Sequence, residues 1–559
     1  MASITGAKQL VESMKAAGVN RIYGIIGTSN VAFVDALYDE TEAIRYISCR
    51  HEQVAATMAD AEGRLTGKPG VVLLHSGPGA LNSLISLTNA AKDCSPAIAI
   101  TGAVKRKLRG GDGMLEVDHL RIFENICRGV FRVNSAAEIG EVFCRAWEAA
   151  VGYPHGPTLI EVPEDVWLEP ISSPPEVRIP KTPLPLKPSE TDVESALENL
   201  QRAERPLLLY GGGIAYAGAA ELALHFAERW NLPVATTGNG RGTMPETHAL
   251  CLGRTGFGGG NIVADFAVQN ADFILAVGCT LSDMTTYEYT RPIAADVITV
   301  NLDEGHDLPG IVLRSAVRAD AKLFLEGILK LSGEGEAPER GEWFASFESS
   351  RKGWQQIVEA GAVAGRVPLA PGYVCREIAK YMGDSNIVTV GAGMHLLYPM
   401  AYIPSLKPLT FLSAVNFGAM GFGMAAGIAA KLISPDRTVV SILGDGDALM
   451  AFQDIETAVR EKIPVKIFIL NDSAYRVLLF RQRLQLGGRI IGTRHGNPDF
   501  ARLAESFGAK GIRIEKPDEV SAKVKETMDA DVPVVVDVII DPDDMAPTNL
   551  QAVLVMGQG

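Results

Sequence analysis

Two aspartates in the last third of the chain, Asp445 and Asp472, have the spacing and surroundings of a metal site. Each follows a short apolar run, residues 438–443 before Asp445 and residues 465–470 before Asp472, and the two aspartates are 27 positions apart. Apolar runs of this kind predict buried parallel strands. Open α/β sheets bind ligands at the carboxyl ends of their strands, where the two side chains would meet. Hard oxygen donors beside a helix N-terminus suit Mg²⁺ that is shared with a phosphate group.

The residues between the two runs complete a βαβ unit. Gly444 and Gly446 flank Asp445 in a turn that we expect to be too tight for a Cβ atom, and a helical pattern follows over residues 455–459. A Gly-Asp-Gly segment by itself is most often only a turn. The second run, which ends in Asn471-Asp472 at this distance, makes a metal site the better interpretation.

The two motifs together resemble the cofactor signature of thiamine-diphosphate (ThDP) enzymes. In that family GDG is followed at this distance by a pair of Asn or Asn/Asp residues. The Asp of GDG, the second residue of the pair and a backbone carbonyl two residues further on hold the metal. The resemblance therefore implies Asp445, Asp472 and Ala474 as the ligands of Mg²⁺. Asp472 stands where Asn is commoner, and its carboxylate adds a negative charge beside the diphosphate.

A second motif lies near the N-terminus, in the segment RHEQVAATMADAEGRLTGKPGVVLLHSGPGALN. Glu52 in this segment begins a predicted helix, where a glutamate most often only complements the helix dipole. The whole segment, however, is similar to the N-terminal domain of acetolactate-synthase-like ThDP enzymes, whose Glu protonates N1′ of the aminopyrimidine. The resemblance implies that Glu52 is the catalytic acid/base. It also implies cofactor contacts by Pro78 and Asn82, although Pro78 could simply shape the turn.

Glycine-rich loops carry the other cofactor contacts that the resemblance implies. Segment 416–423 matches the family's GxMG element, in which an apolar residue lies under the thiazolium ring and a glycine carbonyl meets the 4′-amino group. The small residues of loop 391–394 would let backbone N–H groups approach the phosphates. The alternative for 416–423 is a glycine-rich helix start with Met in the core. The cofactor-binding residues expected here are Ala392, Gly393, Met394, Gly418, Met420, Gly444, Gly446 and Asp447.

Departures from the acetolactate synthases bear on the reaction. Met114 and Leu115 stand where those synthases carry Phe-Gln, so a polar group that faces the substrate is missing. His75 stands where they carry a small or hydroxyl residue, and it is similar to the proton-relaying His of benzoylformate decarboxylase. A His at a strand end is more often a surface or capping residue, so catalysis by His75 is a hypothesis. The expected substrate pocket consists of Ile26, Thr28, Met114, Leu115 and Val477.

Two arginines and the middle of the chain say less about function than the motifs above. Arg476 and Arg481, just past the second predicted strand, are expected to be solvated charges, although they could bind a carboxylate or a larger anion.

The turn at 211–213 does not complete the GxGxxG pattern of dinucleotide-binding folds. Segment 279–284 lacks the arginines that flavin-binding relatives carry, which argues against FAD.

The elements that position these residues alternate between helix and strand over most of the 559 residues. This pattern predicts an α/β fold of three doubly wound parallel-sheet domains. The resemblance implies a pyrimidine-binding domain at 1–170, a middle domain at 190–335 and a diphosphate- and Mg²⁺-binding domain at 365–545. A Pro-rich connector at 172–189 predicts an extended linker. Three α/β domains in series suggest duplication of one architecture.

Composition limits the partners. A net charge of −14 argues against binding to nucleic acid or to an anionic membrane. The seven cysteines form no CxxC pair or metal-binding spacing, which indicates reduced thiols. The N-terminal segment lacks the apolar core of a signal peptide, and the most apolar long stretch, 417–432, is too short to span a bilayer comfortably. We expect a soluble, cytoplasmic protein.

These features predict an enzyme that binds ThDP and Mg²⁺ between its N- and C-terminal domains and cleaves or forms a C–C bond next to a carbonyl group. In the family the two domains come from different subunits, which implies a homodimer or homotetramer. The first choice of reaction is a 2-oxo acid decarboxylase or carboligase. The alternatives are an acyloin or 2-hydroxyacyl-CoA lyase and an acetolactate synthase. Glu52 and Asp445 argue against a catalytically silent relative, and the missing fingerprint argues against a flavin or nicotinamide oxidoreductase.

Overall fold

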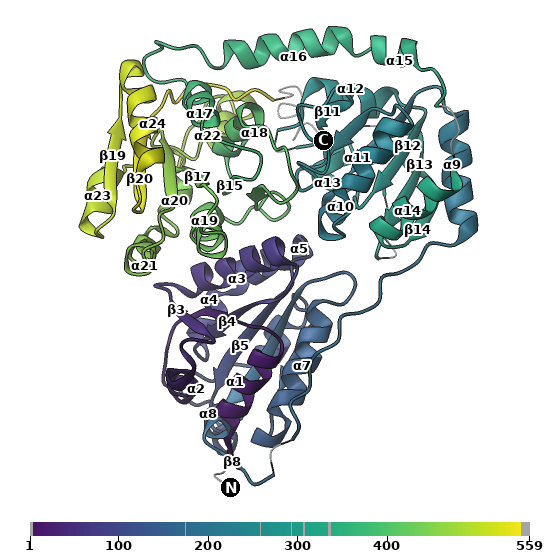
Figure 1. Cartoon of the computed structure of the whole chain (residues 1–559). Coiled ribbons are helices and arrows are strands. Elements are labelled where there is room, and N and C mark those ends of the chain that lie inside the picture. The colour runs from purple at the N-terminus through teal and green to yellow at the C-terminus, as the bar shows by residue number, and fades with distance from the viewer. Residues whose placement is uncertain are drawn as a thin grey trace.

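Three parallel sheets, one in each third of the chain, organise the structure (Figure 1). It is a computed structural model that describes residues 4–548 except 174, 258, 292, 304, 306–307 and 334–336. Within these residues each of the three sheets has six strands, and helices cover the sheets. The structure therefore confirms the predicted α/β fold with three parallel-sheet domains.

The N-terminal sheet has the strand order β3-β2-β4-β5-β7-β6. Its strands are β2 (Arg21–Gly24), β3 (Arg45–Ser48), β4 (Gly70–Leu74), β5 (Ala97–Ala103), β6 (Gly129–Arg132) and β7 (Pro157–Pro163). The helices around it are α1 (Gly6–Ala16), α2 (Val31–Ala36), α3 (Glu52–Thr66), α4 (Pro78–Asn82), α5 (Leu84–Lys92), α6 (His119–Phe123), α7 (Ile139–Ala150) and α8 (Glu164–Trp167). A short antiparallel pair, β1 (Ile4–Thr5) with β8 (Pro170–Ile171), ties the first described residues to the end of this domain.

The C-terminal sheet has the order β16-β15-β17-β18-β20-β19. Its strands are β15 (Ile387–Val390), β16 (Phe411–Ser413), β17 (Val439–Gly444), β18 (Lys466–Asn471), β19 (Lys510–Ile514) and β20 (Val534–Ile539). Its helices are α17 (Pro371–Ala379), α18 (Leu397–Tyr402), α19 (Phe422–Ile433), α20 (Asp445–Ala448), α21 (Ile455–Arg460), α22 (Arg476–Gln485), α23 (Phe500–Ser506) and α24 (Val520–Asp529). Counted from its own first strand, this order is the same as that of the N-terminal sheet.

The middle sheet has a different order, β11-β10-β9-β12-β13-β14, which is that of dinucleotide-binding folds. Its strands are β9 (Pro206–Tyr210), β10 (Val234–Thr236), β11 (Cys251–Arg254), β12 (Phe273–Val277), β13 (Ile293–Asn301) and β14 (Ile311–Arg318). Its helices are α9 (Glu190–Arg202), α10 (Gly212–Tyr216), α11 (Ala220–Arg229), α12 (Ile262–Asn270), α13 (Asp283–Thr286) and α14 (Ala321–Leu331). The expected duplication of one architecture therefore describes the two terminal sheets and is wrong for the middle one.

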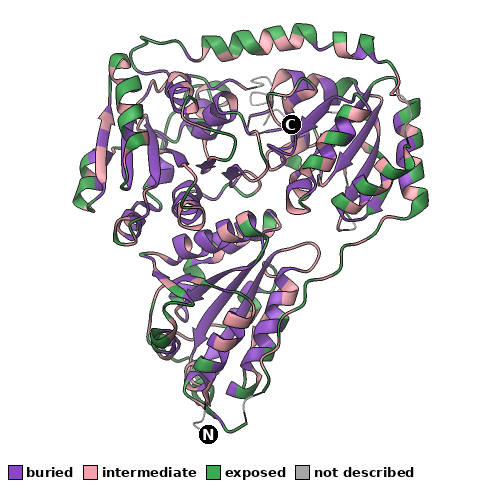
Figure 2. Cartoon of the chain, in the orientation of Figure 1, coloured by how far each residue is buried: buried purple, intermediate pink, exposed green. Residues whose placement is uncertain are grey.

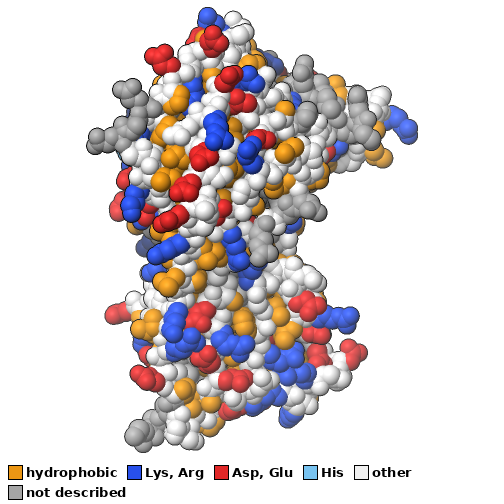
Figure 3. Space-filling view, turned by 90° about the vertical axis from the view of Figure 1, so that its right-hand side faces the viewer, with side chains coloured by type: hydrophobic (Ala, Val, Ile, Leu, Met, Phe, Trp, Pro, Cys, Tyr) orange, Lys and Arg blue, Asp and Glu red, His pale blue; other side chains and the backbone are white. Residues whose placement is uncertain are grey.

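Two connections join the domains. Residues 175–189 contain no helix or strand, as their proline content predicts, and they lead from the N-terminal domain up to α9 (Figure 1). Helices α15 (Gly341–Ala345) and α16 (Glu348–Ala360) cross from the middle to the C-terminal domain along the outer edge of the molecule. None of the residues of α16 is buried, whereas the strands of the sheets are largely buried (Figure 2). On the face drawn in Figure 3, acidic and basic side chains are interspersed.

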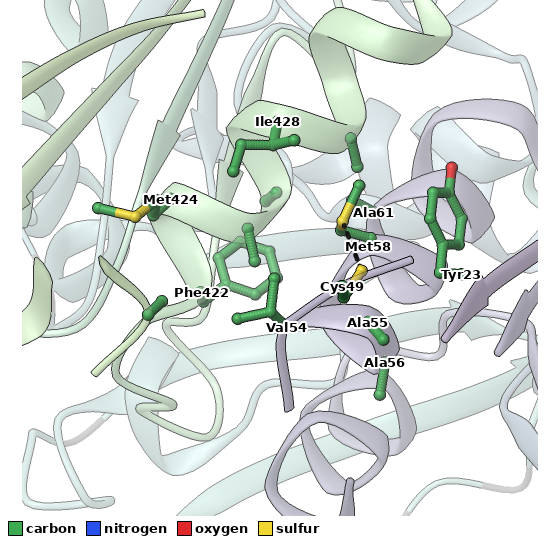
Figure 4. Close-up of a cluster of buried hydrophobic side chains, with 14 of the residues drawn as sticks. Tyr23, Cys49, Val54, Ala55, Ala56, Met58, Ala61, Phe422, Met424 and Ile428 are labelled. Carbon is green, nitrogen blue, oxygen red and sulfur yellow. Dashed lines mark hydrogen bonds between the residues drawn. The ribbon is translucent and has the colours of Figure 1, made fainter. Parts of the chain in front are cut away.

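The N- and C-terminal domains share one apolar core. Val54 and Met58 of α3 belong to the same buried cluster as Phe422 and Ile428 of α19, and none of the four side chains is more than 1% exposed (Figure 4). Burial of apolar side chains on this scale is the dominant favourable contribution to such an interface. The packing of α3 against α19 therefore fixes the first turn of α3 relative to the C-terminal sheet.

A buried polar network joins all three domains beside this core. Arg64 of α3 donates hydrogen bonds to Asp60 (2.8 Å) and Asp93 (2.7 Å), and to the carbonyl of Ser413 at the end of β16 (2.9 Å). Asp93 also accepts from Asn239 of the middle domain and Asn416 of the C-terminal domain. A buried guanidinium needs such partners, because leaving it unpaired would cost several kcal/mol, about 3–5.

Candidate active site

A cavity of about 290 Å³ opens at the carboxyl ends of β17 and β18. Parallel pairing places Gly444 opposite Leu470, so the segments after the two strands emerge side by side. The cavity brings together every site residue that the sequence predicts in the C-terminal domain. These residues are Ala392, Gly393, Met394, Gly418, Met420, Gly444, Asp445, Gly446, Asp447, Asp472, Ala474 and Val477.

The two predicted metal-binding aspartates lie next to each other in this cavity. Asp445 accepts hydrogen bonds at Oδ2 from the backbone N–H groups of Asp472 (3.2 Å) and Ser473 (2.6 Å), and at Oδ1 from that of Gly446 (2.7 Å). Asn497 donates to the same Oδ2 at 2.7 Å. Among the described residues no group of three or more His, Cys, Asp or Glu side chains could hold a metal ion. A metal here would therefore need backbone and phosphate oxygens besides the two carboxylates.

Gly444 and Gly446 allow close approach rather than an unusual turn. Gly444 has φ −86°, which any residue adopts, so the prediction that the turn itself excludes a Cβ atom is wrong. Neighbouring side chains exclude it instead. A Cβ on Gly444 would lie 2.7 Å from Nδ1 of His395, and one on Gly446 would lie 2.5 Å from the ring of Tyr475. Neither His395 nor Tyr475 is among the site residues that the sequence predicts, although both line the cavity.

Two buried polar groups of the cavity wall, Asp447 and His395, each have an atom that makes no hydrogen bond within the described chain. These atoms, Oδ2 of Asp447 and Nε2 of His395, face each other at 3.6 Å. Burial raises the pKa of Asp447 to about 7. Burial, with a smaller contribution from Arg476, lowers the pKa of His395 to about 3. Unsatisfied buried polar atoms are rare and call for a ligand or water, so this donor set fits a metal–diphosphate group.

Arg476 corrects the sequence interpretation. We expected a solvated charge, but Arg476 is only 5% exposed and forms an ion pair with Asp472. It also donates to the hydroxyl of Tyr398 at 2.8 Å and to the carbonyl of Asp541 at 3.1 Å. The reason is its position at the start of α22, directly after the predicted metal-binding segment. Arg481, one turn further on, is exposed as expected.

Glu52 is the first residue of α3 and is 8% exposed. Its Oε2 accepts a hydrogen bond from Nδ2 of Asn82 at 3.0 Å. A Cβ on Gly79 would lie 2.9 Å from the other oxygen, Oε1, so the absence of a side chain there leaves Oε1 accessible. Pro78 begins α4, which carries Asn82. The neighbouring Gln53 donates to the carbonyl of Met420 at 2.8 Å and ties this group to the wall of the cavity.

His75 lies at the end of β4, in the loop that precedes α4. Its Nδ1 is 2.8 Å from Oγ of Ser29, which also accepts from the backbone N–H of Ser76 at 3.0 Å. A Cβ on Gly27 would lie 2.4 Å from the His75 ring, so the ring packs directly on the segment that contains Ile26 and Thr28. His75 and this part of the predicted substrate pocket are therefore neighbours.

A buried pair that the sequence analysis missed supports this loop. His119 is 1% exposed, accepts from the backbone N–H of Gly77 at Nε2 (3.1 Å) and contacts Glu161 through Nδ1 (2.9 Å). Burial would raise the pKa of Glu161, but hydrogen bonds from His119 and Arg132 hold it below its ordinary value. The sequence contains one signal for this pair, because Glu161 is a charged residue inside the apolar strand β7 and a buried carboxylate requires hydrogen-bonding partners.

Within one chain the described N-terminal residues do not line the cavity, although Gln53 contacts Met420 in its wall. In the part of the chain that the structure describes, the cavity is lined only by residues from Ala392 onward. Met114 is 88% exposed and Ile26 48% exposed, while Leu115 accepts a hydrogen bond from Ser76 through its carbonyl. The structure thus brings the predicted site residues together as two groups. One is the cavity group, and the other is the N-terminal group around Glu52.

Three family models match the chain, and each describes a domain of thiamine pyrophosphate (TPP, the same compound as ThDP) enzymes. They are the N-terminal TPP binding domain over residues 4–122, the central domain over 193–328 and the C-terminal TPP binding domain over 391–538. The chain is also 33% identical to a probable acetolactate synthase large subunit of Methanocaldococcus jannaschii, over 97% of this chain and 93% of that one. The chain belongs to the ThDP enzyme family.

Other relatives of this ThDP enzyme carry similar names. The acetolactate synthase large subunit of Corynebacterium glutamicum is 30% identical over 97% of this chain and 87% of its own length. The large subunit of acetolactate synthase isozyme 3 of Escherichia coli is 31% identical over 95% of this chain and 93% of its own length. These relatives confirm the resemblance to acetolactate-synthase-like enzymes.

No described helix is long and apolar enough to cross a membrane, and the seven cysteines, all within the described ranges, are free thiols. A second cavity, of about 190 Å³, lies beside Gly212, Gly213 and Gly278 of the middle domain and is also lined by Asp93 and Asn416 of the two other domains. It is at the switch point between β9 and β12, where such sheets bind ligands. Nothing in it tests the argument against FAD, which stays a prediction.

Proposed function

We propose that this ThDP enzyme binds Mg²⁺ and ThDP in the cavity of its C-terminal domain and acts on a 2-oxo acid as a decarboxylase or carboligase. The observation that supports this proposal is the cavity itself. It is lined by Asp445, Asp472 and Ala474, and also by Asp447, whose Oδ2 makes no hydrogen bond in the described chain. Oxygen donors of this kind suit Mg²⁺ shared with a diphosphate.

The chain's own residues have distinct roles in this proposal. Asp445, Asp472 and the carbonyl of Ala474 hold the metal, and the backbone around Gly444 and Gly446 receives the diphosphate. Bound ThDP would supply a nucleophilic carbon and an electron sink next to the substrate carbonyl.

Glu52 is the proposed acid/base. Asn82 occupies its Oε2, so the accessible Oε1 is the atom that holds and transfers the proton. A fixed carboxyl group of this kind typically contributes about 10²- to 10⁴-fold to the rate.

A second copy of the chain completes the site in this proposal. The cavity of one chain is lined by no described residue of the N-terminal domain, and the Glu52 of a second copy would supply the acid/base. Apolar side chains are exposed on both groups, among them Met114 on the N-terminal side and Leu449 and Met450 beside the cavity. Contact between two copies would bury these side chains, and a symmetric dimer would form two equal sites.

The names of the relatives favour acetolactate synthesis as a second candidate reaction. Met114, Leu115 and His75 favour instead a reaction in which the first product is protonated and released. A polar substrate group left unpaired beside Met114 and Leu115 would cost roughly 1–3 kcal/mol. This cost is enough to slow acetolactate formation by about tenfold relative to protonation and release of the first product. We therefore expect acetolactate to be a minor product from pyruvate, and a less polar 2-oxo acid to be the better substrate.

Incubation of the enzyme with pyruvate and with a panel of 2-oxo acids, acyloins and 2-hydroxyacyl-CoA esters tests this choice. Turnover should depend on Mg²⁺ and ThDP, and chromatography should show an aldehyde or a mixed acyloin as the main product. Acetolactate as the dominant product, formed faster than any other, would show that the loop containing Met114 and Leu115 does not set the reaction. The acetolactate synthase alternative would then hold.

A further inference from the structure

The aspartate at position 472 presents an electrostatic problem. Asp445 and Asp472 lie side by side, and the backbone N–H of Asp472 contacts Oδ2 of Asp445 at 3.2 Å. A second carboxylate beside a diphosphate raises like-charge repulsion in a poorly solvated place. Asp472 therefore requires a charge-compensating partner.

Arg476 meets this requirement, and each of the three nitrogens of its guanidinium donates a hydrogen bond. Its Nε donates to Oδ2 of Asp472, its Nη1 to the hydroxyl of Tyr398 (2.8 Å) and its Nη2 to the carbonyl of Asp541 (3.1 Å). The side chains of Arg476 and Asp472 are 4% and 5% exposed. Additional hydrogen bonds of this kind favour a buried ion pair, because they offset part of its desolvation cost. Both partners are thus held in one geometry.

The consequence concerns the other oxygen of Asp472. Asp472 lines the cavity, and its Oδ1 accepts only a long hydrogen bond, 3.2 Å, from the backbone N–H of Ala474, so this oxygen is the one free to bind a ligand. An asparagine at this position would present one oxygen and one NH₂ group. An aspartate whose Oδ2 is covered by a guanidinium likewise presents one oxygen, and the pair has no net charge.

We infer that Arg476 is a positioning residue that lets Asp472 act as a single-oxygen, electrically neutral ligand where an asparagine would otherwise serve. This inference rests on the proposed Mg²⁺–ThDP site. It makes residues 472 and 476 a functional pair, in which a change at one position alters what is required at the other.

A purely structural role is the competing explanation. Arg476 also anchors the segment after β20, since Tyr398 donates to Asp544 at 2.9 Å and Arg366 forms ion pairs with Asp541 and Asp544. If anchoring were its whole role, neutralising Asp472 would not restore what the loss of Arg476 removes. The two explanations therefore differ in the behaviour of the double variant.

The experiment measures ThDP affinity of the full-length apo protein by isothermal titration calorimetry at several Mg²⁺ concentrations. Arg476→Met should weaken ThDP binding by about ten- to a hundredfold. Asp472→Asn alone should raise the Mg²⁺ concentration needed for half-saturation, because it leaves Arg476 uncompensated. The double variant Asp472→Asn/Arg476→Met should return to within about threefold of the parent.

Two controls separate charge from folding. Arg483→Met removes an arginine of the same helix that pairs with Asp543, and it should leave ThDP affinity unchanged. Arg476→Lys keeps the positive charge and should bind ThDP better than Arg476→Met, which supports the inference even if the Met variant folds poorly.

A double variant as weak as Arg476→Met, or an Arg476→Met variant that binds like the parent, would overturn the inference. A parent that binds no ThDP would overturn the proposed function and the inference with it.

Discussion

The hydrogen bond between Gly77 and His119 gives a prediction that can be resolved to single atoms. A backbone N–H can only donate, so Nε2 of His119 is the acceptor, and the neutral ring donates from Nδ1 to Glu161. His119→Asn places an amide near the position of Nδ1 and leaves the N–H of Gly77 unpaired. His119→Gln reaches the position of Nε2, where its oxygen can still accept from Gly77.

The expected size of the loss in kcat follows from the burial of this loop. Gly77 has φ +65°, and a Cβ on it would lie 2.8 Å from the carbonyl of Leu115, so the loop has little room to rearrange. An unpaired buried N–H costs about 1–3 kcal/mol, which corresponds to roughly a 5- to 150-fold loss of the correct loop conformation. Because the loop carries His75 and lies beside Glu52, we expect His119→Asn to lower kcat by this factor. His119→Gln should lower it much less, since Glu161 keeps its hydrogen bond from Arg132.

The assay measures kcat and KM with the best 2-oxo acid, together with hydrogen exchange of residues 75–79. His119→Asn should speed exchange in this loop and lower kcat more than it changes KM. Equal kcat values for the Asn and Gln variants would refute the argument, because they would show that the Gly77 hydrogen bond is not the interaction that matters. Circular dichroism of both variants shows whether the fold is intact.

Three other predictions concern single residues. Asp445→Ala should abolish the increase in Tm that Mg²⁺ and ThDP give to the parent while leaving the circular dichroism unchanged; a retained increase would contradict the metal assignment. Gly79→Ala places a Cβ 2.9 Å from Oε1 of Glu52 and should lower kcat by up to about a hundredfold with little change in ThDP affinity, whereas an unchanged kcat would show that Oε1 is not the working atom. Burial raises the pKa of Asp454 from 3.8 to about 6, so its favourable contribution to folding is present below pH 3.8 and is lost as the pH rises through 6. The charged form of Asp454 then lowers the free energy of unfolding by at most about 3 kcal/mol at neutral pH. Asp454→Asn should therefore raise the Tm more at pH 8 than at pH 4, and an equal shift at both pH values would contradict this prediction.

The sequence predicts the cavity group because the geometry of parallel strands is general. Strands that are adjacent and parallel must end at the same edge, so Asp445 and Asp472 converge whatever the rest of the chain does. The strand order of the middle sheet could not be predicted in this way, because order depends on contacts between distant segments. The close approaches of His395 to Gly444 and of Tyr475 to Gly446 are likewise tertiary, and they explain why those glycines are required.

Arg476 shows a different limit of sequence reasoning. An arginine after a strand is usually solvated, and no periodicity distinguishes a buried one. Its burial follows from where α22 begins and from the simultaneous presence of Asp472, Tyr398 and the carbonyl of Asp541. The signal available in the sequence was the unusual aspartate at 472, because an additional buried carboxylate requires a cation nearby.

The claim that Glu52 of one copy completes the cavity of another is tested most directly with mixed subunits. Glu52→Gln and Asp445→Ala chains with different affinity tags are co-expressed, and the hybrid dimer is purified through both tags. Each variant alone should be nearly inactive. If the site forms between chains, the hybrid retains one intact site of two and should show about half of the parent's activity. If the site forms within one chain, each chain of the hybrid lacks one essential residue. A hybrid as inactive as the two single variants would contradict the account.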